Sequence, residues 1–220
     1  MSVTAGRERS LRFPSMVNNP IKYRWIYLGF VVLDIDLLRR ETTSDHEAVE
    51  GSIPLMTEDL DTGRYVAVLE QLYGIVAAWE ELLAEVSPDW LQAIRVPRRR
   101  QEMLRDDLAH FGVEAACAGT PMLPLIRSHS ELLGAMYVME GSTLGGQLIA
   151  RHVERVLHLE PGAGDAYFRS HGDRTGAMWK EFCAVLRERI PDAEAGDAVR
   201  SAKEMFGAFG TWMRDTKFKE

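Results

Sequence analysis

A histidine and a glutamate four residues apart, His46 and Glu50, form the first pattern that could do chemistry. In a helix this spacing places both side chains on one face. A histidine that ligates a metal needs an acceptor for its second ring nitrogen, and Glu50 could supply that bond directly or through water. Arg39 precedes His46 by two turns on the same face, where it could meet an anionic group of a ligand. The alternative interpretation is a half-exposed histidine in a charged helix.

The second pattern is a group of three glycines, Gly141, Gly145 and Gly146, inside a long helical pattern. An interior glycine costs roughly 1 kcal/mol relative to alanine, so the three together forgo roughly 3 kcal/mol. Gly141 and Gly145 are four residues apart and share a helix face. Such a helix usually bends, or lets another group approach its backbone closely. Two interpretations stay open: a tight crossing of two helices, or a flat ligand lying against bare backbone.

Motifs that the sequence lacks limit the kind of metal centre that it could form. The sequence has no H-E-x-x-H zinc motif, and its nearest approach to the Glu-x-x-His of di-iron bundles is a single Asp107-x-x-His110. It also lacks the phosphate-loop, nucleophile-elbow and dinucleotide-binding motifs. The features that remain, one histidine with a nearby acceptor and a glycine-rich helix, fit one iron held by one histidine, with a flat ligand supplying the equatorial bonds. That description is haem with a proximal histidine.

The composition is that of an ordinary folded protein. Of the 220 residues, 46% are hydrophobic and 27% are charged, which excludes a disordered, collagen-like or disulfide-stapled chain. The formal net charge of −7 argues against a general nucleic-acid binder, which needs a cationic surface. The two cysteines, Cys117 and Cys183, form no C-x-x-C pair. They indicate buried free thiols in a reducing cytoplasm.

Helical periodicity from Asp34 onward predicts the elements that must position these groups. No run alternates strictly over four to eight residues, so no strand is expected. Helices joined by short loops predict an all-α fold, and residues 34–220 are assigned to one domain. The longer helices are expected over residues 34–50, 60–86, 131–157, 173–189 and 196–213, with shorter ones after Pro88 and Pro97.

Residues 1–33 differ from the rest, with turn-rich segments and no amphipathic period. Their apolar run, Trp25–Leu33, is far shorter than the roughly 20 residues that span a bilayer, so no membrane span is expected. Three interpretations stay open: an extension packed on the body, a disordered leader, or a start codon placed too far upstream.

Four arginines, Arg95, Arg98, Arg99 and Arg100, form the only dense basic cluster of the sequence. One interpretation is a solvated helix start. The other is a docking site for an acidic electron donor such as a ferredoxin or flavodoxin, recognised by complementary charge.

Three segments carry a resemblance to a known family. The sequence resembles the biliverdin-producing haem oxygenases, and within them the bacterial branch found with bacteriophytochromes, over roughly residues 35–215. The resemblance implies a single-domain helical bundle with haem between a proximal helix and a kinked distal helix. The matching segments are Leu38-Arg39…Thr42…His46…Glu50, the run from Tyr137 to Gly146, and Phe168-x-x-His171-Gly172 followed by Gly176-Ala177-Met178-Trp179-x-x-Phe182.

The resemblance implies roles for individual residues. His46 is expected to be the proximal iron ligand, with Glu50 as the acceptor for its ring. The distal wall and the catalytic groups are expected to be Gly141, Ser142 and Gly145. Arg39 and Lys180 match positions whose cations meet the haem propionates, and Tyr137, Gly146 and Phe209 are expected in the haem pocket. Animal enzymes carry an aspartate where this chain has Ser142, which leaves open which groups anchor the distal water.

The implied activity is oxidative opening of haem to biliverdin, with release of iron and carbon monoxide. Haem is then both cofactor and substrate, and the reaction needs O2 and an external electron donor. A ferredoxin or flavodoxin is the expected reductant, and a bacteriophytochrome is the expected acceptor of biliverdin. Two other classes stay open: a haem storage or delivery protein on the same scaffold, and a non-haem relative such as a thiamin-pyrimidine hydrolase. The last lacks a cysteine nucleophile in a matching context.

Overall fold

The computed structural model describes residues 35–117 and 119–215, so the predicted extension 1–33 lies outside the described residues. Its α-helices are α1 (Ile35–Glu50), α2 (Thr62–Val86), α3 (Gln92–Arg95), α4 (Gln101–His110), α5 (His129–Leu157), α6 (Ala166–Arg169), α7 (Thr175–Arg189) and α8 (Ala195–Asp215). Single 3₁₀ turns at Asp89–Leu91, Val96–Arg98, Gly172–Arg174 and Asp192–Glu194 link several of them. The described ranges contain no β-strand, which confirms the predicted all-α fold.

The helix ends follow local capping chemistry. Asp61 accepts a hydrogen bond from the backbone N–H of Arg64 at 2.8 Å and starts α2. Ser128 starts α5 by accepting from the N–H of Glu131 at 3.1 Å. The Glu131 carboxylate reaches back to the N–H of Arg127 at 2.6 Å, a variant of the capping box. These caps explain why α2 and α5 begin within two residues of the predicted positions.

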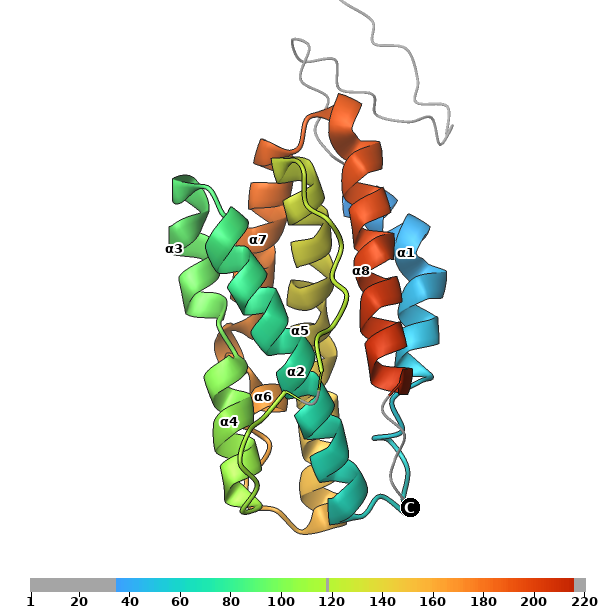
Figure 1. Ribbon diagram of the computed structural model, residues 1–220, viewed down its shortest axis with the longest axis vertical. Coiled ribbons are helices and arrows are strands. Elements are labelled where there is room, and N and C mark those ends of the chain that lie inside the picture. Colours follow the sequence, from blue (N-terminus) through green and yellow to red (C-terminus); the bar gives the residue numbers. More distant parts are fainter. Residues whose placement is uncertain (1–34, 118, 216–220) are drawn as a thin grey trace, which may run out of the picture.

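Helix α5 runs through the middle of the bundle and packs against α6, α7 and α8 (Figure 1). Helices α1 and α8 pack together on one side, while α4 lies on the other side against α2. Gly134 permits the close crossing of α5 and α8, because a Cβ there would lie 2.1 Å from the Ala198 carbonyl oxygen. The glycine-rich part of α5 lies opposite α1, the helix that carries His46.

Helix α6 was not predicted, because four residues are too few to show a helical period. A side chain from another helix stabilises it instead: the buried Asp107 of α4 accepts the N–H groups of Ala166 at 2.8 Å and Tyr167 at 2.9 Å. Burial raises the pKa of the Asp107 carboxyl, and these two hydrogen bonds oppose the rise. Asp107 of the Asp107-x-x-His110 pattern therefore serves as a helix cap.

The interpretation of the four arginines as a solvated start or docking surface is wrong for two of them. The Arg98 and Arg100 side chains are buried, with residue exposures of 6% and 4%. Arg98 Nε lies 3.0 Å from a Glu140 oxygen, and its Nη2 lies 2.8 Å from Glu181. The two side chains turn inward: Arg98 contacts the Met178 carbonyl and the Glu140 and Glu181 carboxylates, and Arg100 donates to the Met139 carbonyl. Sequence clustering of charge does not reveal that direction.

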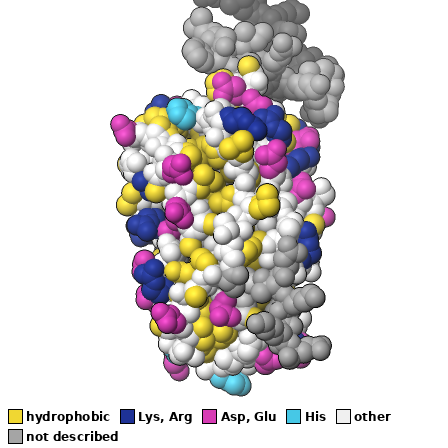
Figure 2. Space-filling model, viewed as in Figure 1, with side chains coloured by type: hydrophobic (Ala, Val, Ile, Leu, Met, Phe, Trp, Pro, Cys, Tyr) yellow, Lys and Arg dark blue, Asp and Glu magenta, His cyan; other side chains and the backbone are white. Residues whose placement is uncertain are grey.

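The two cysteines differ in exposure. Cys183 is buried as predicted, but Cys117 is exposed, so the prediction of two buried thiols is wrong for Cys117. Acidic and basic side chains are interspersed over the face shown in Figure 2, with apolar surface between them. Across the described residues, no helix is both long and apolar enough to cross a membrane.

Candidate active site

A cavity of about 390 Å³ lies between α1 and the glycine-rich part of α5. This volume is within the usual range of about 300–1,000 Å³ for small-molecule sites. Aromatic rings from two other helices close it, Tyr167 and Phe168 of α6 and Phe206 and Phe209 of α8. The predicted pocket residue Phe209 therefore lies at the cavity. The mostly apolar lining suits a flat, largely hydrophobic ligand.

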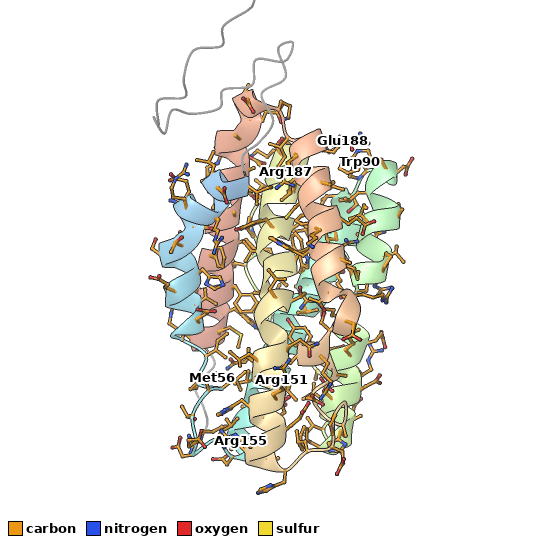
Figure 3. All side chains as sticks on the ribbon, turned by 180° about the vertical axis from the view of Figure 1, so that it is seen from behind. Met56, Trp90, Arg151, Arg155, Arg187 and Glu188 are labelled. Atoms are coloured by element: carbon orange, nitrogen blue, oxygen red, sulfur yellow. The ribbon has the colours of Figure 1, made fainter. Side chains whose placement is uncertain are left out.

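The cavity opens between the segment that follows α1 and the outer face of α5. Met56 and Leu148 line it, and they are unusually exposed for large apolar side chains, at 49% and 63%. Figure 3 labels Met56 beside α5 on this side of the molecule. A ligand seated in the cavity would cover this apolar rim.

His46 and Glu50 stand on the α1 wall, as their spacing predicts. The His46 ring meets the Phe206 ring edge-on, with 5.8 Å between centroids. Its Nδ1 atom lies 3.6 Å from a Glu50 oxygen, which is too long for a direct hydrogen bond but suits a bridging water. The described residues provide no hydrogen-bond partner for the Nε2 atom, so this nitrogen remains for a ligand.

The three glycines have different structural roles. A Cβ on Gly146 would lie 2.3 Å from the Phe168 carbonyl oxygen, so this glycine is needed for packing against α6. A Cβ on Gly145 would meet nothing within 4 Å, and one on Gly141 would make an ordinary contact with Trp179 at 3.8 Å. All three line the cavity. Of the two interpretations that the sequence left open, close packing holds at Gly146, while the open space at Gly145 leaves the flat ligand a prediction.

Hydroxyl groups beside the glycines hydrogen-bond back to the helix. Ser142 Oγ donates to the Met139 carbonyl at 2.8 Å, and Thr143 Oγ1 donates to the Glu140 carbonyl at 2.7 Å. Bonds of this kind often bend helices. Helix α5 nevertheless stays helical from His129 to Leu157, so the glycines and hydroxyls shape its surface without ending it.

Three predicted residues do not line the cavity. Arg39 and Lys180 are exposed, and Tyr137 packs against Trp179 with 5.5 Å between ring centroids. Burial raises the pKa of the Tyr137 hydroxyl, and the hydrogen bond with Thr42 and the charge of Arg39 oppose the rise. Arg39 and Tyr137 are therefore neighbours near the α1, α5 and α7 helices, beyond the cavity. Lys180 follows Trp179 on α7, and its contact with a ligand remains a prediction.

The structure adds lining residues that the sequence did not suggest, above all Arg100 and Phe206. Arg100 was assigned to a surface cluster, and Phe206 is one of several apolar residues on the inner face of α8. No local pattern distinguishes either residue, because only tertiary packing brings them to the cavity: α8 packs against α5, and the Arg100 side chain, just before α4, reaches the Met139 carbonyl of α5. The described part of the chain contains no cluster of three or more histidine, cysteine, aspartate or glutamate side chains able to hold a metal.

His171 has a buried environment that makes its acid–base behaviour testable. Its Nε2 atom is buried without a hydrogen-bond partner among the described residues. Burial, followed by the charges of Arg100, Arg98 and Arg174, lowers its pKa from 6.5 to about 4. The folded protein therefore binds fewer protons at His171 than the unfolded chain between about pH 4 and 6.5.

We accordingly expect the stability contributed by neutral His171 to be complete above about pH 6.5 and to be lost as the pH falls toward 4. Urea unfolding at pH 7 and pH 5 should show a smaller acid-dependent loss of stability in His171→Gln than in the wild type. The exposed His129 provides the control, since His129→Gln should leave this difference unchanged. An NMR titration that places the pKa of His171 near 6.5 would contradict the expectation.

Comparison with known proteins agrees with this geometry. A family model described as "Heme oxygenase" matches residues 35–215. The chain is 35% identical over 158 residues to a heme oxygenase of Xanthomonas campestris, covering 69% of this chain and 90% of that protein. It is 26% identical over 187 residues to heme oxygenase PigA of Pseudomonas aeruginosa, covering 80% and 88%.

Solved structures show the same fold. The heme oxygenase of Neisseria meningitidis superposes with a TM-score of 0.67 at 20% identity, covering 82% of this chain and 89% of that one. The heme oxygenase of Leptospira interrogans gives a TM-score of 0.66 at 19% identity, covering 82% and 98%. The family match spans nearly all the described residues, and the Xanthomonas protein is related along most of its own length. The chain therefore belongs to the haem oxygenase family.

Proposed function

We propose that this protein is a haem oxygenase that opens haem to biliverdin, releasing iron and carbon monoxide and using O2 with electrons from an external donor. Family membership supports this activity. The single structural observation that carries it is the opposition of His46, whose Nε2 atom has no partner among the described residues, to the bare backbone at Gly145 across one apolar cavity. One histidine and a flat apolar space suit an iron porphyrin, which brings its own equatorial ligands.

The α1 wall would hold the iron. When bound, haem supplies the iron that activates oxygen and also the ring that is oxidised. His46 is the residue that would hold the iron, and Glu50, whose carboxylate lies 3.6 Å from Nδ1, would set the orientation and basicity of its ring through a bridging water. Phe206, edge-on to the imidazole, limits its rotation.

The α5 wall would orient the reaction. Gly141 and Gly145 keep side-chain atoms out of the space beside the helix, so the backbone itself limits where a second ligand can lie. The Ser142 hydroxyl donates to the Met139 carbonyl, and its oxygen, 3.4 Å from Arg100 Nη2, has a second lone pair that can accept a hydrogen bond from water. We therefore propose Gly141, Ser142 and Gly145 as the catalytic wall, with Gly146 holding it against α6.

The remaining proposed contacts lie at the edges of the site. Arg39 and Lys180 are exposed cations, suited to meet propionates that extend beyond the cavity. Tyr137 is proposed to support this end of the site through its contact with Trp179. We propose a cytoplasmic location, since Cys117 and Cys183 are both free thiols.

A ferredoxin or flavodoxin is the proposed electron donor, but the buried Arg98 and Arg100 no longer support docking at that cluster. A bacteriophytochrome as biliverdin acceptor rests on the sequence resemblance alone. Haem storage or delivery is less well supported, because a storage site gains nothing from the bare backbone at Gly145.

The test is to mix the purified protein with hemin, record the absorption spectrum, and add ascorbate or a ferredoxin system in air. We expect a Soret band that bleaches as biliverdin absorption grows. A stable Soret band under these conditions would instead indicate storage or delivery. If no Soret band forms, both functions are refuted. Carbon monoxide release, measured with reduced myoglobin, distinguishes enzymatic opening from unspecific bleaching.

A further inference from the structure

The segment of residues 51–61, which joins α1 to α2, forms a strap along one lip of the cavity mouth. Ile53, Leu55 and Met56 line the cavity from this side. Leu55 is buried at 2% exposure, whereas Met56 beside it is 49% exposed. The strap contains no helix, so contacts with other elements must fix its position.

Two side chains of α5, His152 and Arg155, hold the far end of the strap. His152 Nε2 lies 3.1 Å from the Thr57 carbonyl oxygen, and since a carbonyl only accepts, this nitrogen carries the proton. Arg155 binds the Glu58 carboxylate in bidentate fashion, with Nη1 donating at 2.9 Å and Nη2 at 2.6 Å. Both contacts join segments that are far apart in the chain.

The four groups form one connected network. Arg155 Nη2 also lies 3.2 Å from His152 Nδ1, which is the accepting nitrogen when Nε2 carries the proton. The hydrogen bonds from Arg155 lower the pKa of the Glu58 carboxyl, so it is ionised at neutral pH. A bidentate pair has a defined geometry, unlike most exposed ion pairs. This latch of Thr57, Glu58, His152 and Arg155 therefore ties the strap to α5.

The latch continues the lip of the cavity mouth that α5 forms. Leu148 lines the cavity, and His152 and Arg155 follow it by four and seven residues on the same helix face. Met56 and Arg155 both lie beside the lower half of α5 in Figure 3. The two lips of the mouth, the strap and the outer face of α5, are therefore joined at the latch.

We infer that this latch closes one end of the cavity mouth and that its opening governs the entry and exit of haem. The inference rests on the proposed function, because that function identifies haem as the ligand. The Arg155 and Glu58 side chains are 57% and 77% exposed, so their contact can break without unfolding the core. The strap can then move away from Leu148 while α1 and α5 stay in place. Loss of the latch should speed both entry and exit, whereas loss of a contact with bound haem would speed exit alone.

The first test measures opening of the strap in the haem-free full chain. Leu55→Cys places a thiol at the buried strap position, and Cys117→Ser removes the exposed cysteine. The rate at which a disulfide reagent (DTNB) labels the new thiol reports how often the strap opens. Arg155→Met and His152→Ala each remove one side of the latch. Arg151→Met is the matched control, since Arg151 is exposed, lies on the same helix and forms no ion pair within the described ranges.

We expect labelling to be about 2- to 10-fold faster in Arg155→Met and in His152→Ala, the range for losing one hydrogen bond. Arg151→Met should label at the rate of the parent protein. His152→Gln should stay close to the parent rate, because its amide still donates to the Thr57 carbonyl. Labelling of the buried Cys183, measured without the added thiol, is subtracted. The parent rate in both latch variants would overturn the inference, as would equal acceleration in Arg151→Met.

The second test measures haem exchange in the chain without the added thiol. Excess apomyoglobin captures haem that leaves the loaded protein, and stopped-flow absorption follows hemin entering the haem-free protein. Both rates should rise by about 2- to 10-fold in Arg155→Met, with the ferric Soret spectrum of the wild type, because the latch does not contact His46. Faster exit with unchanged entry would overturn the inference. A protein that exchanges hemin as expected but never opens it refutes the proposed function and supports the latch, so the two failures are distinguishable.

Discussion

Replacement of His46 by alanine is expected to remove the protein ligand of the haem iron and to reduce haem turnover by at least about 100-fold. Changing a residue that only supports a metal ligand already costs about 10- to 100-fold in affinity or activity, so loss of the ligand itself should cost no less. His46 is half-exposed on α1, so its removal leaves no large cavity in the core. The Soret spectrum and the rate of biliverdin formation measure the two effects.

The histidine variant has two informative controls. His129→Ala changes an exposed histidine that packs against Trp90, away from the cavity, and should leave the haem spectrum unchanged. Added imidazole should restore part of the wild-type spectrum in His46→Ala, because the space left by the side chain opens onto the cavity. A His46→Ala protein with wild-type haem spectra and turnover would show that another group ligates the iron.

Alanine at Gly145 and alanine at Gly146 are expected to change the stability of the protein in opposite directions. Alanine at Gly145 is also expected to lower haem turnover. At Gly145 an added Cβ meets nothing within 4 Å, so Gly145→Ala should fold and gain up to about 1 kcal/mol from helix propensity. The same methyl group projects beside the cavity, where it crowds the proposed ligand. Turnover should therefore fall although the protein is more stable, and Gly145→Leu should lower it further.

Gly146→Ala is expected to lower the free energy of unfolding by about 1–3 kcal/mol, the usual range for overpacking. Its Cβ would lie 2.3 Å from the Phe168 carbonyl oxygen, and backbone atoms cannot move aside as a flexible side chain can. Urea unfolding of the haem-free wild type, Gly145→Ala and Gly146→Ala, together with their rates of biliverdin formation, distinguishes the roles of the two glycines. Similar stability changes in Gly145→Ala and Gly146→Ala would contradict this assignment of packing to one glycine and ligand space to the other.

Patterns among neighbouring residues were sufficient to predict most helices and the placement of His46 and Glu50 on α1. Capping residues and apolar spacing are properties of neighbouring residues, so they predicted α5 to within two residues of its observed start at His129. The four-residue spacing likewise places His46 and Glu50 on one helix face regardless of what surrounds them. Helix α6 escaped prediction because its stabilising group, Asp107, belongs to a distant helix.

Tertiary packing decided the chemistry of the opposite wall. The sequence shows four arginines in six positions and three glycines in six, without indicating which arginine is buried or which glycine faces open space. Those properties depend on atoms from other helices: Glu80 and Met139 around Arg100, and Phe168 against Gly146. The sequence by itself determined an all-α chain and the placement of His46 and Glu50 on one helix face. Only the tertiary structure placed a buried cation across the cavity from it, because burial and ion pairing depend on segments far apart in the chain.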